Sequence, residues 1–259
     1  GNAGIHICRK LSNLGKFKTI ELHGGKGLPE CQTHEEYEAS VPKLGNKLRL
    51  GKDQDIWLIV CGAARVSGTT LAILEQIKDR EVKVMYIVPD SFFMSATQKK
   101  QHRVVSNVLQ EYARSGMIHS LWLIDNKEAT KIVGEGALGS YYDNTNSAIA
   151  NFLANYNWFN NTDPIVGNLH EPKEISRIRT VSIGDIEKNE EKLYFLLDNI
   201  IESCYYYSIS SETKENDNKL LSRIRSYLET KEQTTFGIWE NGSNRSFFYS
   251  IKFTHYIQE

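Results

Sequence analysis

Two glycine-containing turns in the sequence combine backbone amides with hydroxyl groups, which suits them to binding phosphate. The chain opens with Gly1-Asn2-Ala3-Gly4 and runs into a segment with helical apolar spacing, so the first N–H groups of that helix are free for an anion. The second turn, residues 62–70, reads Gly-Ala-Ala-Arg-Val-Ser-Gly-Thr-Thr between a strand pattern and a helix pattern. Both turns predict a phosphate site, although a helix N-cap at Ser67 or Thr69 also explains the second.

Arg65 adds a positive charge to the second turn. A guanidinium group in such a loop fits phosphate oxygens, and the alternative is an ordinary solvated arginine. We expect the phosphate side of a ligand to contact residues from both turns: Gly1, Asn2, Ala3, Gly62, Arg65, Ser67, Gly68 and Thr69.

Three further residues have the chemistry to recognise a nucleobase. The ring of Tyr142 offers a stacking surface, and the carboxamides of Asn126 and Asn146 each present a donor and an acceptor to the edge of a purine. Each residue also has an ordinary interpretation, with Tyr142 in the core and Asn146 as a helix cap. Their combination favours a base site.

The elements that must position these residues alternate along the first half of the chain. Buried strand patterns cover residues 56–61, 82–88 and 120–124, and a shorter one covers 17–22. Helices are expected at residues 5–14, 69–78, 96–115 and 127–133. This alternation predicts an α/β fold with a doubly wound, mostly parallel sheet, in which ligands bind beyond the carboxyl ends of the strands.

The second half of the chain has a different pattern. A long helix from residue 142 to about 156 precedes a polar loop at 157–172, and helices are then expected at 173–179, 189–202 and 219–229. A strand is expected at 205–210, between the last two of these helices. Two further strands are expected at 235–240 and 245–256, joined by the hairpin signal Asn241-Gly242. We therefore expect a nucleotide-binding domain at 1–141, a central helix and loop at 142–172, and a smaller α+β domain at 173–259.

Composition limits the classes of partner. Of the 259 residues, 31 are basic and 32 acidic, so no net field attracts nucleic acid or an anionic membrane. The four cysteines form no CxxC pair and fit a reducing cytoplasm, and no apolar run approaches the ~20 residues that a membrane span needs. Because a strand normally precedes a turn like that at Gly1, we also expect one ahead of the present start.

The ordered combination of these segments resembles the tubulin/FtsZ superfamily. Residues 1–7 are similar to the first nucleotide turn of tubulins, and Gly62 with Ser67-Gly68-Thr69 matches the two ends of the phosphate loop. Ile124-Asp125-Asn126 and Tyr142 to Asn146 look like the two segments that contact guanine. The resemblance covers nearly the whole chain and implies binding of GTP or GDP with Mg²⁺.

The chain departs from the family pattern at its phosphate loop. Ala64, Arg65 and Val66 stand where the family has consecutive glycines, which puts the close approach of backbone to phosphate in doubt. The ribose contacts of the family have no clear match in residues 90–95, and no segment matches its γ-phosphate loop.

The resemblance also implies hydrolysis completed between subunits. The candidate catalytic carboxylates are Glu171 and Glu174, with Asp163 as the fallback. The alternative is that Glu171 and Glu174 occupy the first turn of a helix, where acidic residues are favourable anyway.

The sequence thus predicts a GTPase that assembles with itself head to tail, with no direct nucleic-acid or membrane partner. The first alternative is a degenerate relative that keeps the fold without hydrolysis or polymerisation, which the replaced glycines favour. A dinucleotide-dependent oxidoreductase fits poorly, because the chain lacks the GxGxxG fingerprint.

Overall fold

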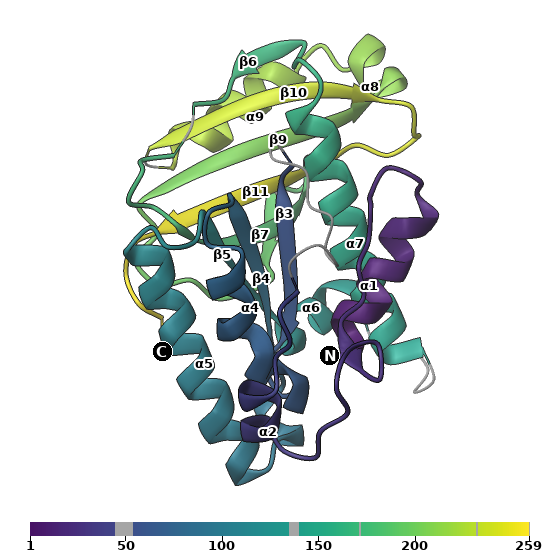
Figure 1. Cartoon of the computed structure of the whole chain (residues 1–259). Coiled ribbons are helices and arrows are strands. Elements are labelled where there is room, and N and C mark those ends of the chain that lie inside the picture. Colours follow the sequence, from purple (N-terminus) through teal and green to yellow (C-terminus); the bar gives the residue numbers. More distant parts are fainter. Residues whose placement is uncertain (45–53, 135–139, 171, 232, 259) are drawn as a thin grey trace.

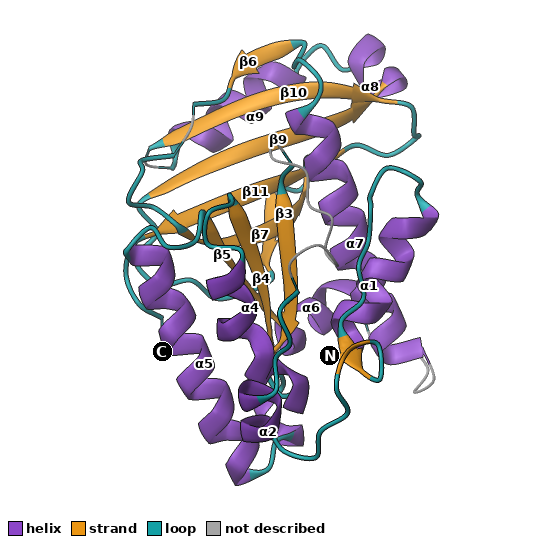
Figure 2. Cartoon of the chain, viewed as in Figure 1, coloured by secondary structure: helices purple, strands orange, loops and turns teal. Residues whose placement is uncertain are grey.

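A computed structural model describes residues 1–44, 54–134, 140–170, 172–231 and 233–258 of the chain. Helices surround one large twisted sheet (Figure 1), and Figure 2 separates the two kinds of element by colour. The expected α/β class, with a mostly parallel sheet in the first half and a long helix leading into a second α+β part, is confirmed. Across the described ranges, no helix is both long and apolar enough to cross a bilayer.

The first half supplies three parallel strands and the helices around them. Its elements are α1 (Asn2–Asn13), β1 (His23–Gly24), β2 (Gly27–Leu28), α2 (His34–Ala39), β3 (Ile56–Cys61), the 3₁₀ helix η1 (Arg65–Thr69), α4 (Thr70–Gln76), β4 (Val82–Val88), the 3₁₀ helix η2 (Ser91–Phe93), α5 (Ala96–Arg114), β5 (Ser120–Asp125) and α6 (Asn126–Val133).

The second half begins with the long helix and adds an antiparallel component. Its elements are α7 (Tyr141–Asn160), β6 (Val166–Asn168), β7 (Ile178–Asp185), β8 (Glu190–Leu193), β9 (Glu202–Ser210), α8 (Ser211–Asn216), α9 (Leu220–Glu229), β10 (Thr234–Asn241) and β11 (Phe247–Thr254).

The two halves share one sheet in the order β3-β4-β5-β7-β11-β9-β10-β6, with β8 beside β7. The strands β3, β4 and β5 are parallel, so their carboxyl ends lie on one edge. The link between the halves is short, because β5 and β7 pair only through Leu121 with Ile178 and Trp122 with Arg179. The domain boundaries at 141/142 and 172/173 stay a prediction.

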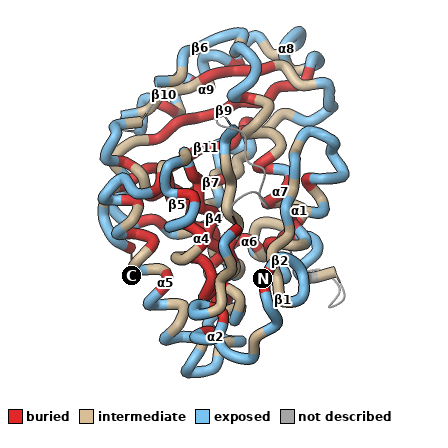
Figure 3. The backbone as a smooth tube through the Cα atoms, in the orientation of Figure 1, coloured by how far each residue is buried: buried red, intermediate tan, exposed pale blue. Residues whose placement is uncertain are grey.

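Aromatic side chains attach α7 to both parts of this sheet. Phe152 packs against Trp122 of β5 at 5.7 Å and Tyr249 of β11 at 5.4 Å between ring centroids. About two turns further along α7, Phe159 packs against Trp239 of β10 with ring centroids 4.8 Å apart. The opposite face of β3–β5 is covered by α4 and α5, and α9 packs on β9, β10 and β11. The buried residues are therefore concentrated along the strands (Figure 3).

Two expected strand features are wrong. Residues 17–22 form no strand, although Leu22 still packs against the buried cluster beside β3. The last two strands form no hairpin, because β9 lies between β10 and β11. Asn241 does make a local turn, accepting a hydrogen bond from the Ser243 amide at 2.8 Å, but the chain crosses β9 before it pairs again.

Two expected helices are also wrong. The segment 173–179 is a turn followed by β7, in which the polar-looking Arg179 is buried with its guanidinium 5.7 Å from the Trp122 ring centre and 5.0 Å from that of Phe253. The segment 189–202 begins as β8, because a turn at Asp185 and the left-handed Asn189 fold it back antiparallel on β7. Tertiary pairing outweighed local helical periodicity in both segments.

A buried ion pair fastens β8 to the sheet. Lys252 on β11 lies 2.9 Å from Oε1 of Glu191, and the two side chains are only 7% and 13% exposed. The Ser182 and Ser250 hydroxyls donate to the same carboxylate oxygen, and Tyr227 of α9 donates to the other at 3.0 Å. Burial opposes ionisation of Glu191, but Lys252 and the two serine hydroxyls together hold the pKa of its carboxyl below the ordinary value.

Replacing Lys252 by methionine should leave the buried Glu191 charge unpaired and lower the free energy of unfolding by about 3 kcal/mol. The double variant Glu191→Met/Lys252→Met should recover most of that loss, because neither charge then remains buried. Urea titrations of both proteins measure the difference. Lys214→Met, which breaks an exposed pair with Glu240, is the control and should change little. Equal losses in the single and double Glu191/Lys252 variants would contradict this account.

Candidate functional site

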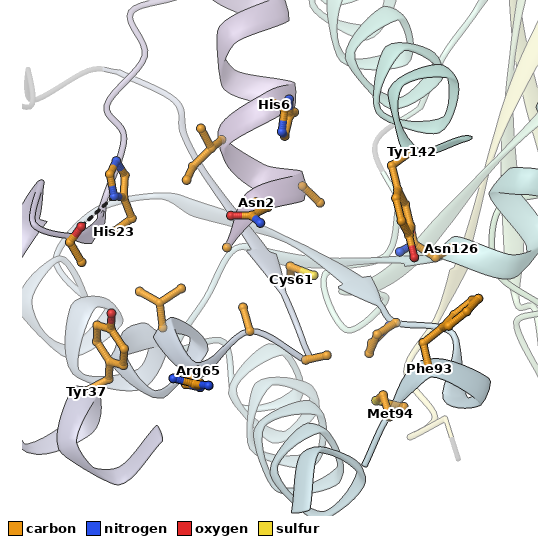
Figure 4. A pocket seen from close by; sticks show the side chains of 18 of the residues that line it. Asn2, His6, His23, Tyr37, Cys61, Arg65, Phe93, Met94, Asn126 and Tyr142 are labelled. Atoms are coloured by element: carbon orange, nitrogen blue, oxygen red, sulfur yellow. Dashed lines mark hydrogen bonds between the residues drawn. The ribbon is translucent and has the colours of Figure 1, made fainter. Parts of the chain in front are cut away.

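A cavity of about 850 Å³ lies at the carboxyl ends of β3 and β4, between the start of α1 and the starts of α6 and α7 (Figure 4). Its volume is in the range of small-molecule sites, roughly 300–1,000 Å³. The structure brings seven of the predicted residues to its wall: Gly1, Asn2, Ala3, Arg65, Asn126, Tyr142 and Asn146.

The two predicted phosphate turns touch each other. A Cβ atom on Gly1 would lie 2.6 Å from Cβ of Ala64, so only glycine lets the start of α1 approach the second turn this closely. Gly4 packs in the same way on β3, where a Cβ would lie 2.9 Å from the Ile59 carbonyl oxygen. The amino end of α1, which carries no acidic residue in its first turn, therefore opens directly onto the cavity.

Only the front part of the second turn lines the cavity. Residues 63–66 form its wall, and Arg65 is exposed there, whereas Ser67, Gly68 and Thr69 are buried behind them. A Cβ on Gly68 would overlap with the carbonyl oxygen of His34 in α2, so this glycine makes room for a neighbouring helix.

Gly62 has a similar packing role. A Cβ there would overlap with the hydroxyl of Tyr86, which is itself hydrogen-bonded to Nδ1 of His102 at 2.8 Å. Direct contact of a nucleotide with Gly62, Ser67, Gly68 or Thr69 stays a prediction.

The three residues expected to recognise a base meet at the other side of the cavity. Asn126 is the first residue of α6, and Figure 4 shows it beside the ring of Tyr142. Tyr142 is 54% exposed, whereas Asn146, one helical turn along α7, is only 4% exposed at the cavity wall. Asp125 fixes the start of α6 by accepting from the Lys127 amide at 2.7 Å, and burial raises the pKa of its carboxyl.

Several wall residues were not expected from the sequence. His6 and Cys61 share the wall with Asn2, and Phe93 and Met94 form the opposite rim (Figure 4). His6 could have been found, because it lies four residues after Asn2 and so on the same helical face. Burial raises the pKa of the Cys61 thiol, which keeps it protonated near neutral pH.

The part of the wall contributed by residues 23–37 gives no comparable signal in the sequence. It includes His23, whose Nδ1 donates to the Gly24 carbonyl at 2.9 Å, and Tyr37 of α2. These residues reach the cavity because the chain runs back to the amino end of α1 after that helix ends (Figure 3).

Two carboxylates of the described residues, Glu30 and Asp90, line the cavity. Asp90 also accepts from the Phe92 amide at 2.9 Å. No three His, Cys, Asp or Glu side chains cluster as a metal site within the described ranges. These donors suit Mg²⁺ in the usual nucleotide arrangement, in which one or two carboxylates act together with phosphate oxygens.

The two described candidates for a catalytic carboxylate, Asp163 and Glu174, do not line this cavity. Asp163 is exposed just beyond the last turn of α7, a helix of 20 residues and so about 30 Å long. Glu174 lies in the turn before β7, 3.3 Å from Arg177, and not in a helix as expected. Glu171 lies outside the described residues. The cavity and Asp163 therefore occupy opposite ends of α7.

No protein-family model matches this sequence, and comparison with curated proteins finds no match either. Solved structures do match. CetZ from Methanosaeta thermophila superposes with a TM-score of 0.70 at 12% identity, over 99% of this chain and 85% of that one. A GTPγS-bound protofilament of CetZ2 from Haloferax volcanii gives 0.67 at 14% identity, over 97% and 90%. An empty FtsZ dimer from M. jannaschii gives 0.63 at 11%, over 86% and 70%.

This chain has the tubulin/FtsZ fold. At these identities the likeness concerns the fold alone. Within the tubulin-like fold of this chain, α7 is the long helix between the two parts of the sheet, with the cavity at its amino end.

The packing roles of the glycines can be tested by adding one methyl group. Gly68→Ala should lower the free energy of unfolding by about 2 kcal/mol, because the methyl group meets the backbone of α2. Gly242→Ala is the matched control, since a Cβ there meets no atom within 4 Å and stability should hardly change. Thermal or urea unfolding of both variants gives the comparison, and an unchanged Gly68→Ala protein would refute the packing role.

Proposed function

We propose that this protein binds a guanine nucleotide in the cavity and assembles with itself head to tail. The observation that carries the proposal is the convergence of Asn126, Tyr142 and Asn146 on one side of a cavity whose other side is the amino end of α1. A ligand with a planar, hydrogen-bonding part and an anionic part matches both sides. A nucleotide has both parts.

The base side favours guanine through its carboxamides. Guanine presents adjacent donors and an acceptor on one edge. A carboxamide can hydrogen-bond to both kinds of group, because its oxygen accepts and its nitrogen donates. Asn146 is only 4% exposed on α7, so few side-chain rotamers are open to its carboxamide. Tyr142 is exposed enough for its ring to cover a face of the base.

The proposed phosphate side of the cavity has fewer glycines than the family pattern and carries the additional positive charge of Arg65. The amides at the start of α1 supply partial positive charge, and Arg65 supplies a full one from the exposed part of the second turn. Mg²⁺ accompanies the triphosphate in this proposal, with Glu30 and Asp90 as the carboxylates within reach of the cavity.

Self-assembly is supported by the polarity of the molecule. The cavity and the carboxyl end of α7 form two different surfaces at opposite ends, and a contact between unlike surfaces repeats without closing. The matched CetZ2 structure is a protofilament, and so is a matched GTPγS-form structure of TubZ from Bacillus thuringiensis serovar israelensis. We place the assembly in a reducing cytoplasm, since all four cysteines are free.

For hydrolysis we propose Asp163 ahead of Glu174. Asp163 is exposed just beyond the end of α7. Glu174 is ion-paired with Arg177 and lies in a turn instead of the helix expected from the sequence. A second candidate function is a non-hydrolysing assembly component. It is favoured by Ala64, Arg65 and Val66, which replace the glycines that let phosphate approach the backbone.

Asn146→Ala should weaken binding of GDP roughly tenfold, because the base loses a preorganised hydrogen-bonding partner. Asn151→Ala, an exposed position on the same helix, is the matched control and should bind as the original protein does. Titration calorimetry with GDP, and with ADP for specificity, measures both. Unchanged GDP affinity in Asn146→Ala would argue against base recognition by this side chain.

Hydrolysis completed between subunits should give a GTPase rate per molecule that increases with protein concentration. Asp163→Asn should lower that rate roughly 100-fold without changing GDP affinity, whereas Glu174→Gln should have a small effect. Phosphate release from purified protein at several concentrations measures it. Bound nucleotide with no turnover at any concentration would establish the second candidate function.

A further inference from the structure

Two adjacent aromatic rings stand out from the rim of the cavity. Phe92 is 84% exposed and Phe93 62%, and their rings meet edge to face with centroids 5.1 Å apart. Phe93 lines the cavity at the rim beside Met94 (Figure 4), whereas Phe92 is not among the residues that line it. Rings this exposed mark a contact surface when the backbone holds them in place.

The backbone beneath these rings is held at both ends. Asp90 caps the turn at the Phe92 amide at 2.9 Å, and Ser95 and Gln98 form a reciprocal capping box at the start of α5. Nε2 of the Gln98 side chain also donates to the carbonyl oxygen of Ala63, 3.2 Å away in the second predicted phosphate turn. The ring pair is therefore preorganised and tied to the wall of the proposed nucleotide site.

A second apolar surface lies at the opposite end of the molecule. Ile165 and Val166 are 49% and 41% exposed, at the start of β6, which is the last strand of the described sheet (Figure 1). Ile165 donates to the Ile238 carbonyl at 2.7 Å, and Trp239 fixes the preceding loop through the Thr162 carbonyl at 3.0 Å. This surface is also rigid, and its exposed side chains are aliphatic.

We propose that Phe92 and Phe93 of one copy pack on Ile165 and Val166 of the next, as the apolar centre of the head-to-tail contact. The inference rests on the proposed self-assembly and names the two surfaces that make it. A second copy is the occupant because the two apolar surfaces are complementary in character and lie at opposite ends of α7. In this contact Asp163, two residues before Ile165, arrives at the rim of the neighbouring cavity.

The test uses one variant for each surface. We call Phe92 and Phe93 the head surface, and Ile165 and Val166 the tail surface. Phe92→Ser removes the head ring that does not line the cavity, and Ile165→Ser/Val166→Ser removes the tail side chains. Val104→Ser, on the outer face of α5 and 61% exposed, is the matched control. With GTP present, each surface variant alone should associate at least roughly tenfold more weakly than the original protein in analytical ultracentrifugation, and the control should not. GDP binding by Phe92→Ser should be unchanged.

Mixing the two variants gives the decisive result. A head variant keeps its tail and a tail variant keeps its head, so an equimolar mixture should form dimers that grow no further. A mixture that stays monomeric, or a Phe92→Ser protein that associates normally, overturns the inference while leaving nucleotide binding and self-assembly intact. A tail variant that dimerises alone shows a ring-to-ring contact and also overturns it. An original protein that binds GTP yet stays monomeric refutes the proposed self-assembly itself.

Discussion

The packing of α7 against both parts of the sheet is the constraint on which the other features depend. Direct pairing between the parts is limited to the short contact of β5 with β7, so the rings of Phe152 and Phe159 carry much of the connection. Because α7 is one continuous helix, it also sets the distance between the cavity at its start and Asp163 beyond its end. A change in this packing would alter both ends together.

Close backbone contacts shape the side of the cavity formed by the start of α1 and residues 63–66. Gly1 and Gly4 allow α1 to lie against Ala64 and β3, and Gly62 and Gly68 make room for Tyr86 and α2. Glycines in a phosphate turn are usually explained by the ligand, but here four of them are already required by the protein. Ala64, Arg65 and Val66, which stand where the family pattern has glycines, line the cavity, whereas Gly62 and Gly68 make contacts behind its wall.

The far part of the sheet is stabilised by buried charge as well as by apolar packing. Glu191 and Lys252 form a hydrogen-bonded pair there, and Arg179 lies between the rings of Trp122 and Phe253. Such groups cost free energy when they lose their partners, so they favour one arrangement of β7, β8 and β11 over others. Because charged residues usually lie on the surface, Arg179, Glu191 and Lys252 also make this region appear solvent-exposed when only the sequence is considered.

The sequence by itself determined the strands β3, β4 and β5 and the helices around them, because buried parallel strands and their helices follow local periodicity. The strand at 82–88 was predicted to the residue. Asn126, Tyr142 and Asn146, chosen from residue type, order and the family resemblance, line one cavity, and their role in recognising a base stays a prediction. Only the tertiary structure decided the pairing of the last strands around β9, the helix-like segments that became β7 and β8, and the wall residues 23–37. Those features depend on partners distant in the chain, on which local patterns carry no information.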